Sequence, residues 1–198
     1  LKAGARQCDG TFDRLSGDAP SAVEAAARSG HTEGVALLVK SGADPERIAA
    51  ALHLAAEGGH LETVRVLVEL SPAAVAATDD AGHTAFELAA RRGRVDVARF
   101  LARVGNIGPD VLASALHLAA TGEHVPVMRV LVDDLCAPLD ATHGSYASPV
   151  LVTAAQWAST AAPVAVLIDA GAPINAATTA GYTALHTAIV RGKADIVA

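Results

Sequence analysis

A ten-residue segment recurs along this chain, and this repetition constrains the fold more than any other feature of the sequence. The segment ALHLAAEGGH at residues 51–60 returns almost unchanged as ALHLAATGEH at residues 115–124. Weaker copies occupy residues 22–31, 85–94 and 184–193. With one divergent copy near Ser148, the period is about 33 residues, which predicts an array of similar, stacked units.

The residue types in each unit are those of two short helices that must pack closely. The chain contains 46 alanines but only 3% aromatic residues, and small residues gather in the first helix of each unit. A glycine such as Gly59 or Gly93 ends this helix, because glycine adopts a backbone conformation that is costly for other residues. The second helix carries Val and Leu at helical spacing, as in residues 64–68. One such pair cannot bury its apolar face alone, so the units are expected to stack into a solenoid.

Short motifs connect the repeat to a known family. Residues 183–188 read TALHTA, residues 79–84 read DDAGHT before a first helix, and residues 42–45 and 171–175 (GADP and GAPIN) close a second helix. With these motifs the chain resembles the ankyrin repeat family, whose unit of about 33 residues has a Thr-Pro-Leu-His-x-Ala core. The resemblance covers nearly the whole chain. It implies an all-α solenoid of stacked antiparallel helix pairs, joined by short β-turn or hairpin links.

The repeat pattern also predicts how the chain is divided. We expect one ankyrin-repeat domain over residues 1–198, and its two ends both fall inside a unit. Because arrays normally end in polar capping repeats, we expect a fragment of a longer array or of a multidomain protein. The predicted parts are the tail of a preceding repeat at 1–5, an extended linker at 6–20, and repeats at roughly 21–45, 46–77, 78–107, 108–139, 140–173 and 174–198, the last one truncated.

Some units depart from the family pattern. The links at residues 45–48 and 108–111 are about four residues short, so the repeats that follow them are expected to lack a full projecting hairpin. Near Ser148 the pattern gains about two residues, and Leu151 replaces the usual histidine. Pro163 falls where a second helix should begin, a position that tolerates proline.

Charge and cysteine content limit the classes of partner and location. The net charge of -6 argues against nucleic-acid binding and against binding to anionic membranes, since both favour a basic excess. No stretch approaches the roughly 18 apolar residues of a membrane span, so we expect no membrane insertion. Cys8 and Cys136 lie far apart in the sequence, which favours a reducing compartment over a disulfide scaffold. We expect an intracellular, cytoplasmic protein, and one that is monomeric on its own.

Nothing in the sequence favours catalysis. Two histidines of one copy, His53 and His60, flank a helix end and do not have the spacing of zinc ligands. No motif activates either cysteine, and no nucleophile elbow or phosphate-binding loop is present. We therefore predict no catalytic, cofactor-binding or metal-binding residue, no cofactor and no enzymatic activity. In the family that the chain resembles, histidines at recurring positions orient turns by hydrogen bonding, and six of the eight recur here: His31, His53, His60, His117, His124 and His186.

Residues that bind a partner are predicted at the turn tips and at the ends of the first helices, which border the concave face of an ankyrin-like solenoid. The arginines among them could instead be a solvated helix face, and Trp157 could instead fill a gap in the irregular repeat. The predicted residues are Asp80, His83, Arg91 and Arg92 in the middle of the chain, which would suit a partly acidic peptide or domain, and Tyr146, Trp157, Tyr182 and Arg191 toward its end, which offer aromatic contact area.

The leading functional hypothesis is a protein–protein interaction scaffold that binds a partner protein or peptide on its concave face. The alternative is a regulatory or targeting segment of a larger multidomain protein, such as an enzyme, a channel or a secreted effector, whose active domain lies outside this sequence. A third hypothesis is a spacer that has no partner on the concave face.

Overall fold

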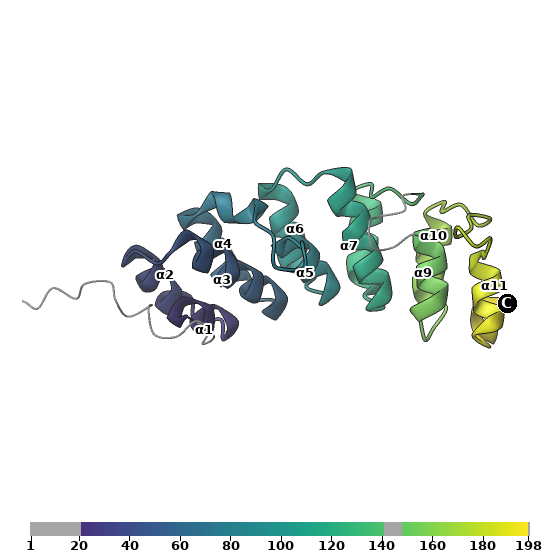
Figure 1. Ribbon diagram of the computed structural model, residues 1–198, viewed down its shortest axis with the longest axis horizontal. Helices are drawn as coiled ribbons and strands as arrows, with labels where there is room; N and C mark the ends of the chain where they lie inside the picture. Colours follow the sequence, from purple (N-terminus) through teal and green to yellow (C-terminus); the bar gives the residue numbers. More distant parts are fainter. Residues whose placement is uncertain (1–20, 141–147, 198) are drawn as a thin grey trace, which may run out of the picture.

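The computed structural model describes residues 21–140 and 148–197, and over these residues the chain is a row of helix pairs (Figure 1). The first helices of the pairs are α1 (Ala22–Arg28), α3 (Pro45–Gly58), α5 (Ala85–Arg91), α7 (Pro109–Thr121), α9 (Val150–Trp157) and α11 (Ala184–Val190). The second helices are α2 (Thr32–Lys40), α4 (Leu61–Leu70), α6 (Val95–Val104), α8 (Val125–Arg129), α10 (Ala162–Asp169) and α12 (Ala194–Val197). The 3-10 helix η2 (Pro72–Ala76) follows α4, and the π-helix η3 (Val130–Asp134) continues α8.

Each first helix packs on the next first helix along the chain, from α1 on α3 through to α9 on α11, and so forms one layer of the stack. The second helices α2, α4, α6, α8 and α10 form the other layer. Within the described ranges no β-strand forms, although two isolated antiparallel bridges join Thr78 to Thr84 and Ala177 to Thr183. The predicted all-α solenoid is confirmed. The repeat boundaries stay a prediction, and its segments 1–5 and 6–20 lie outside the described residues.

The core follows the contacts between successive first helices. Alanines of α3 and α5, among them Ala51, Ala55, Ala85 and Ala89, are fully buried. Because a methyl side chain takes little room, the backbones of neighbouring helices can approach closely. Larger apolar side chains of the first helices, such as Leu52 and Leu116, are also fully buried and belong to the same continuous core.

Local signals define where the first helices begin and end. Thr84 and Glu87 form a capping box at the start of α5, and α1 and α11 begin in the same way. The predicted left-handed glycines are confirmed, with φ of 84° at Gly59 and 70° at Gly93. In the fourth unit the glycine comes one position earlier, at Gly122. The left-handed conformation therefore falls on the next residue, Glu123, with φ of 57°. A non-glycine residue in this region carries a backbone strain of about 1–2 kcal/mol.

The two short links contain no hairpin, as predicted. At both places the chain uses the available residues to extend the following first helix by a turn, so α3 begins at Pro45 and α7 begins at Pro109. Proline suits the first position of a helix, since its missing N–H has no partner there. By contrast, a hairpin precedes α5 at residues 78–84 and another precedes α11 at residues 177–183. The rim of the stack is therefore uneven from one unit to the next.

Among the described residues, no helix combines the length and the apolar character needed to cross a membrane.

Candidate partner-binding surface

A groove of about 580 Å³ lies on the layer of first helices, between α1, α3 and α5. We call it the first-helix groove. Part of its lining is apolar and comes from Ala49, Ala50, Leu54 and Leu88. The charged residues that line it are the acidic Glu24, Glu46, Glu57, Asp79 and Asp80 and the basic Arg28 and Arg91.

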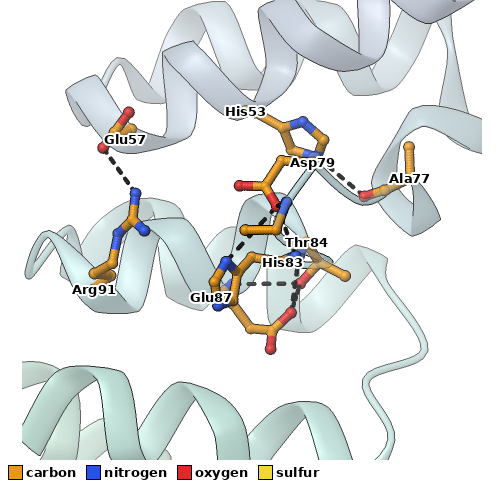
Figure 2. Close-up of polar contacts among 9 residues, drawn as sticks. His53, Glu57, Ala77, Asp79, His83, Thr84, Glu87 and Arg91 are labelled. Carbon is orange, nitrogen blue, oxygen red and sulfur yellow. Dashed lines mark hydrogen bonds and ion pairs between the residues drawn. The ribbon is translucent and has the colours of Figure 1, made fainter. Parts of the chain in front are cut away.

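Ion pairs at both ends of α3 show that α1, α3 and α5 run parallel. Near the helix starts, Arg47 Nη1 of α3 lies 3.0 Å from Glu24 Oε1 of α1. Near the helix ends, Glu57 Oε1 of α3 lies 3.2 Å from Arg91 Nη2 and 2.6 Å from Arg92 Nη2 (Figure 2 draws the Arg91 contact). Residues from the same end of different helices therefore share one edge of the groove.

The parallel arrangement gives the groove two rims of opposite character. The hairpin rim, at the helix starts, contains Glu46, Asp79 and Asp80. The arginine rim, at the helix ends, contains Arg28, Arg91 and Arg92, together with Glu57, although Arg92 does not itself line the groove. Acidic residues at helix starts and basic residues at helix ends also complement the helix dipoles, but Asp80 lies outside any helix.

The hairpin of residues 78–84 is held by the side chain of Asp79. Asp79 Oδ1 accepts the backbone N–H of Ala81 at 2.9 Å and that of His83 at 2.8 Å, so the carboxylate closes the turn on itself. Below it, the side chain of Glu87 accepts both the backbone N–H and the hydroxyl of Thr84, each at 2.8 Å (Figure 2). From α3, His53 Nε2 lies 3.0 Å from the carbonyl oxygen of Ala77. These contacts fix the hairpin on the groove and hold Asp80 at its edge.

Glu57 is the electrostatic centre of the arginine rim. Partial burial alone would raise its pKa, but hydrogen bonds from Arg92 and Arg91 and the charges of both arginines outweigh this effect and lower the pKa of Glu57 below its usual value of 4.5. The ionised carboxylate is therefore favoured in the folded state. The three groups together carry one net positive charge.

The lowered pKa of Glu57 predicts a pH dependence of stability. A carboxylate with a depressed pKa contributes stability that is present above its unfolded-state pKa and is lost as the pH falls through its folded-state pKa. We therefore expect the free energy of unfolding of Glu57→Gln to decrease less steeply than that of the parent as the pH falls below 4.5. Urea unfolding between pH 3 and 7 measures this. Glu33→Gln, an exposed change on α2, serves as the control. If the free energy of unfolding of Glu57→Gln falls as steeply below pH 4.5 as that of the parent, the claim that the pKa of Glu57 is lowered in the folded state is contradicted.

The structure places the four residues predicted in the middle of the chain around this groove. Asp80 and Arg91 line it, whereas His83 and Arg92 lie beside it. The Nδ1 atom of His83 is buried without a hydrogen-bond partner and lies 3.7 Å from Asp79 Oδ1. Arg91 and Arg92 differ from the expectation of two cations open to an acidic partner, since both are paired with Glu57.

The aromatic residues predicted toward the C-terminal end do not form one cluster. Trp157 ends α9 and is 55% exposed, so the interpretation that it fills a gap in the core is wrong. Tyr182 is 52% exposed and lies on the hairpin before α11, edge-on to His186. Arg191 lies at the other end of α11, exposed. Tyr146 lies outside the described residues.

Sequence reasoning missed the other charged residues of the groove, which are Glu24, Arg28, Glu46 and Glu57. A signal for Glu57 was available, since Glu57 and Arg91 occupy the same position of adjacent copies, at 51–60 and 85–94. In a stack of parallel first helices, equivalent positions of adjacent units lie side by side.

A second recurring contact fastens the units of α4, α6, α8 and α12 to the units before them. The side chain of the residue just before a second helix contacts carbonyl oxygens at the end of the first helix of the preceding unit. His60 Nε2 lies 3.0 Å from the carbonyl oxygen of Arg28, His124 Nε2 lies 2.9 Å from that of Arg91, and Arg94 Nε donates to that of Glu57 at 3.0 Å. In the last unit, Lys193 Nζ donates to three carbonyl oxygens of residues 155–158, at 2.6–3.0 Å. We call these the reach-back contacts.

Hydrogen bonds account for five of the six recurring histidines. His53 and His117 bind carbonyl oxygens before the next first helix, His60 and His124 make reach-back contacts, and His186 binds Thr183. Their predicted role in orienting turns is confirmed. Within the part of the chain that the structure describes, no group of three His, Cys, Asp or Glu side chains could hold a metal ion. Cys136 is exposed and unpaired there, and Cys8 falls outside it.

Comparison with known proteins agrees with this geometry. A family model described as ankyrin repeats in three copies matches residues 23–113. Neurogenic locus notch homolog protein 1 of Xenopus tropicalis and of Xenopus laevis is 33% identical over 124 residues, which cover 61% of this chain and 5% of the relative. The crystal structure of the ankyrin repeat domain of Bcl-3, described as a unique member of the IkappaB protein family, superposes with a TM-score of 0.71 at 27% identity and covers 90% of this chain and 82% of that one. Residues 23–113 are ankyrin repeats, and the described chain has the fold of an ankyrin repeat domain.

Ankyrin repeats are in general protein–protein interaction modules, and ankyrin-repeat relatives are typically non-enzymatic. The first-helix groove lies within the three ankyrin repeats that the family model matches.

Proposed function

We propose that this ankyrin-repeat stack is an interaction module that binds a segment of a partner protein in the first-helix groove. The observation that carries this proposal is the groove itself, which combines an apolar lining from Ala49, Ala50, Leu54 and Leu88 with charged rims. Apolar contact area with a few placed charges is the usual composition of a recognition site, because the apolar part supplies affinity and the charges supply orientation.

Support for a defined shape comes from the contacts around the groove. The Glu57 cluster ties α3 to α5, Arg47 ties α3 to Glu24 of α1, and the Asp79 turn is closed by its own side chain. A surface that is ordered before binding loses less conformational entropy when a partner binds.

Filling the groove should weaken binding of the partner. Ala50 lines the groove, and Ala50→Arg would place a long side chain in it, so we expect the affinity for the partner to fall at least tenfold, or about 1.4 kcal/mol. Ala165→Arg, on the exposed face of α10 in the second-helix layer, is the matched control. Affinity purification with mass spectrometry identifies proteins that the control retains and Ala50→Arg loses, and calorimetry with the purified partner gives the two dissociation constants.

The proposal fails if every captured protein binds the parent, the control and Ala50→Arg with the same affinity. Circular dichroism must first show that all three proteins have the same helix content and melting temperature.

A second candidate function is regulation or targeting within a larger protein. It is favoured by the Notch relatives, in which the matching stretch is 5% of the whole length. The complete open reading frame would test it. A cytoplasmic location and a monomeric state also stay predictions, which imaging of a fluorescent fusion protein and light scattering would test.

A further inference from the structure

The first-helix groove carries three charged side chains for which the described residues provide no ion-pair partner. Glu46 and Asp80 lie on the hairpin rim, and Arg28 lies on the arginine rim. All three are exposed. Because they are exposed and have no ion-pair partner among the described residues, these three side chains are available to charges on a partner.

The two rims differ in net charge. On the hairpin rim, Glu46, Asp79 and Asp80 are three carboxylates, while the neighbouring Glu24 is neutralised by Arg47. On the arginine rim, Arg28 adds one positive charge to the single net positive charge of the Glu57 cluster. The groove is therefore negative along one edge and positive along the other, with an apolar lining between them.

We propose that this groove selects a partner segment whose charges are divided into two poles, with basic residues against the hairpin rim and acidic residues against the arginine rim. This proposal rests on the proposed function and specifies the chemistry of the partner. Charges arranged in this way attract a complementary segment and repel one whose charges fall in the wrong order, so they set specificity and the rate of association.

The length of α3 sets the spacing of the poles. Glu46 and Glu57 are separated by a helical rise of about 16 Å. An extended chain covers this distance in about five residues. The segment should therefore carry its basic and acidic residues about five positions apart, with apolar residues between them to meet Ala50 and Leu54.

Defined peptides test the proposal without knowledge of the natural partner. One fluorescein-labelled peptide carries two lysines, a four-residue apolar spacer and two glutamates, so that its inner charges are five positions apart. A second peptide has the same composition with the four charges interleaved. We expect fluorescence anisotropy to show at least tenfold tighter binding of the two-pole peptide by the parent protein at 50 mM salt. This preference should shrink at 200 mM salt, because rim charges are screened.

A charge-reversed protein provides a gain-of-function readout that a misfolded protein would not give. Replacing both Glu46 and Asp80 with lysine makes both rims positive. We expect this protein to bind the two-pole peptide at least tenfold more weakly and to gain affinity for a third peptide that has glutamates at both ends. Glu33→Lys with Glu69→Lys changes the net charge equally on α2 and α4 and should leave all three affinities unchanged.

Equal binding of the two-pole and interleaved peptides by the parent would overturn the proposal, and so would equal effects of the two double variants, since these would show a response to net charge alone. If the two-pole peptide does not bind while a cellular partner is still lost with Ala50→Arg, the two-pole proposal is rejected and the proposed function stands.

Discussion

Replacing Leu116 with alanine is expected to lower the free energy of unfolding by about 2–5 kcal/mol, the range for a fully buried leucine. Leu116 is 0% exposed and belongs to the continuous core of the stack. It lies in α7, which packs between α5 and α9, so the cavity would weaken the contacts of one unit with both of its neighbours. Urea unfolding followed by circular dichroism measures the change.

The matched change near the end of the stack is Ile196→Ala in α12. Ile196 is only partly buried against the core, and the unit that contains it is fastened to one described neighbour. Because each repeat contacts only adjacent repeats, we expect a much smaller loss of stability at this position. Equal losses for Leu116→Ala and Ile196→Ala would show that the stack behaves as one globular core instead of a linear array.

Replacing Gly93 with alanine is the second change with a large expected effect, a loss of about 1.5–3.5 kcal/mol in the free energy of unfolding. Gly93 has φ of 70°, a conformation that costs other residues about 1–2 kcal/mol. Its new Cβ would also lie 2.7 Å from His124 Nδ1. The imidazole must then move and lose its reach-back contact with Arg91, which adds about 0.5–1.5 kcal/mol.

A control separates the two parts of this effect. Gly42 also has a positive φ, of 93°, but a Cβ there would meet nothing within 4 Å, so Gly42→Ala should show the backbone cost alone. Combining Gly93→Ala with His124→Ala should cost less than the sum of the two single changes, because the contact can be lost only once. Additive losses in this double-mutant cycle would show that the glycine is required for its backbone conformation and not for the approach of His124.

The helix pairs could be predicted from the sequence because their signals are local and repeated. The capping box at Thr84, the left-handed turn at Gly59 and the proline that opens α3 each act within one turn of chain. Repetition then supplies the long-range information, since five copies must all stack in the same way. The sequence shows that glycine comes one position early at Gly122-Glu123. Only the backbone conformation shows that Glu123 takes the left-handed conformation there.

The candidate site was only partly predictable, because its electrostatics arise between repeats. Arg91 looks like an open cation in its own repeat, and it is neutralised by Glu57, 34 residues earlier. Trp157 could not be assigned from the sequence, because its exposure depends on how an irregular repeat meets its neighbours. Features that depend on one repeat alone were predicted well. The charge of a surface shared by several repeats could be obtained only from the structure.

The reach-back contacts have a consequence for how the stack comes apart. The position before α10 is Ala161, whose methyl side chain cannot make this contact, and Glu123 Oε1 instead accepts the hydroxyl of Ser159 at 2.7 Å. Under a pulling force, or in native-state proteolysis, we expect the seam between α8 and α10 to open first. Residues 150–197, joined to each other by Lys193, would then detach as one piece and leave the repeats that carry the groove folded. The uneven distribution of reach-back contacts would thus divide a continuous stack into two mechanical segments.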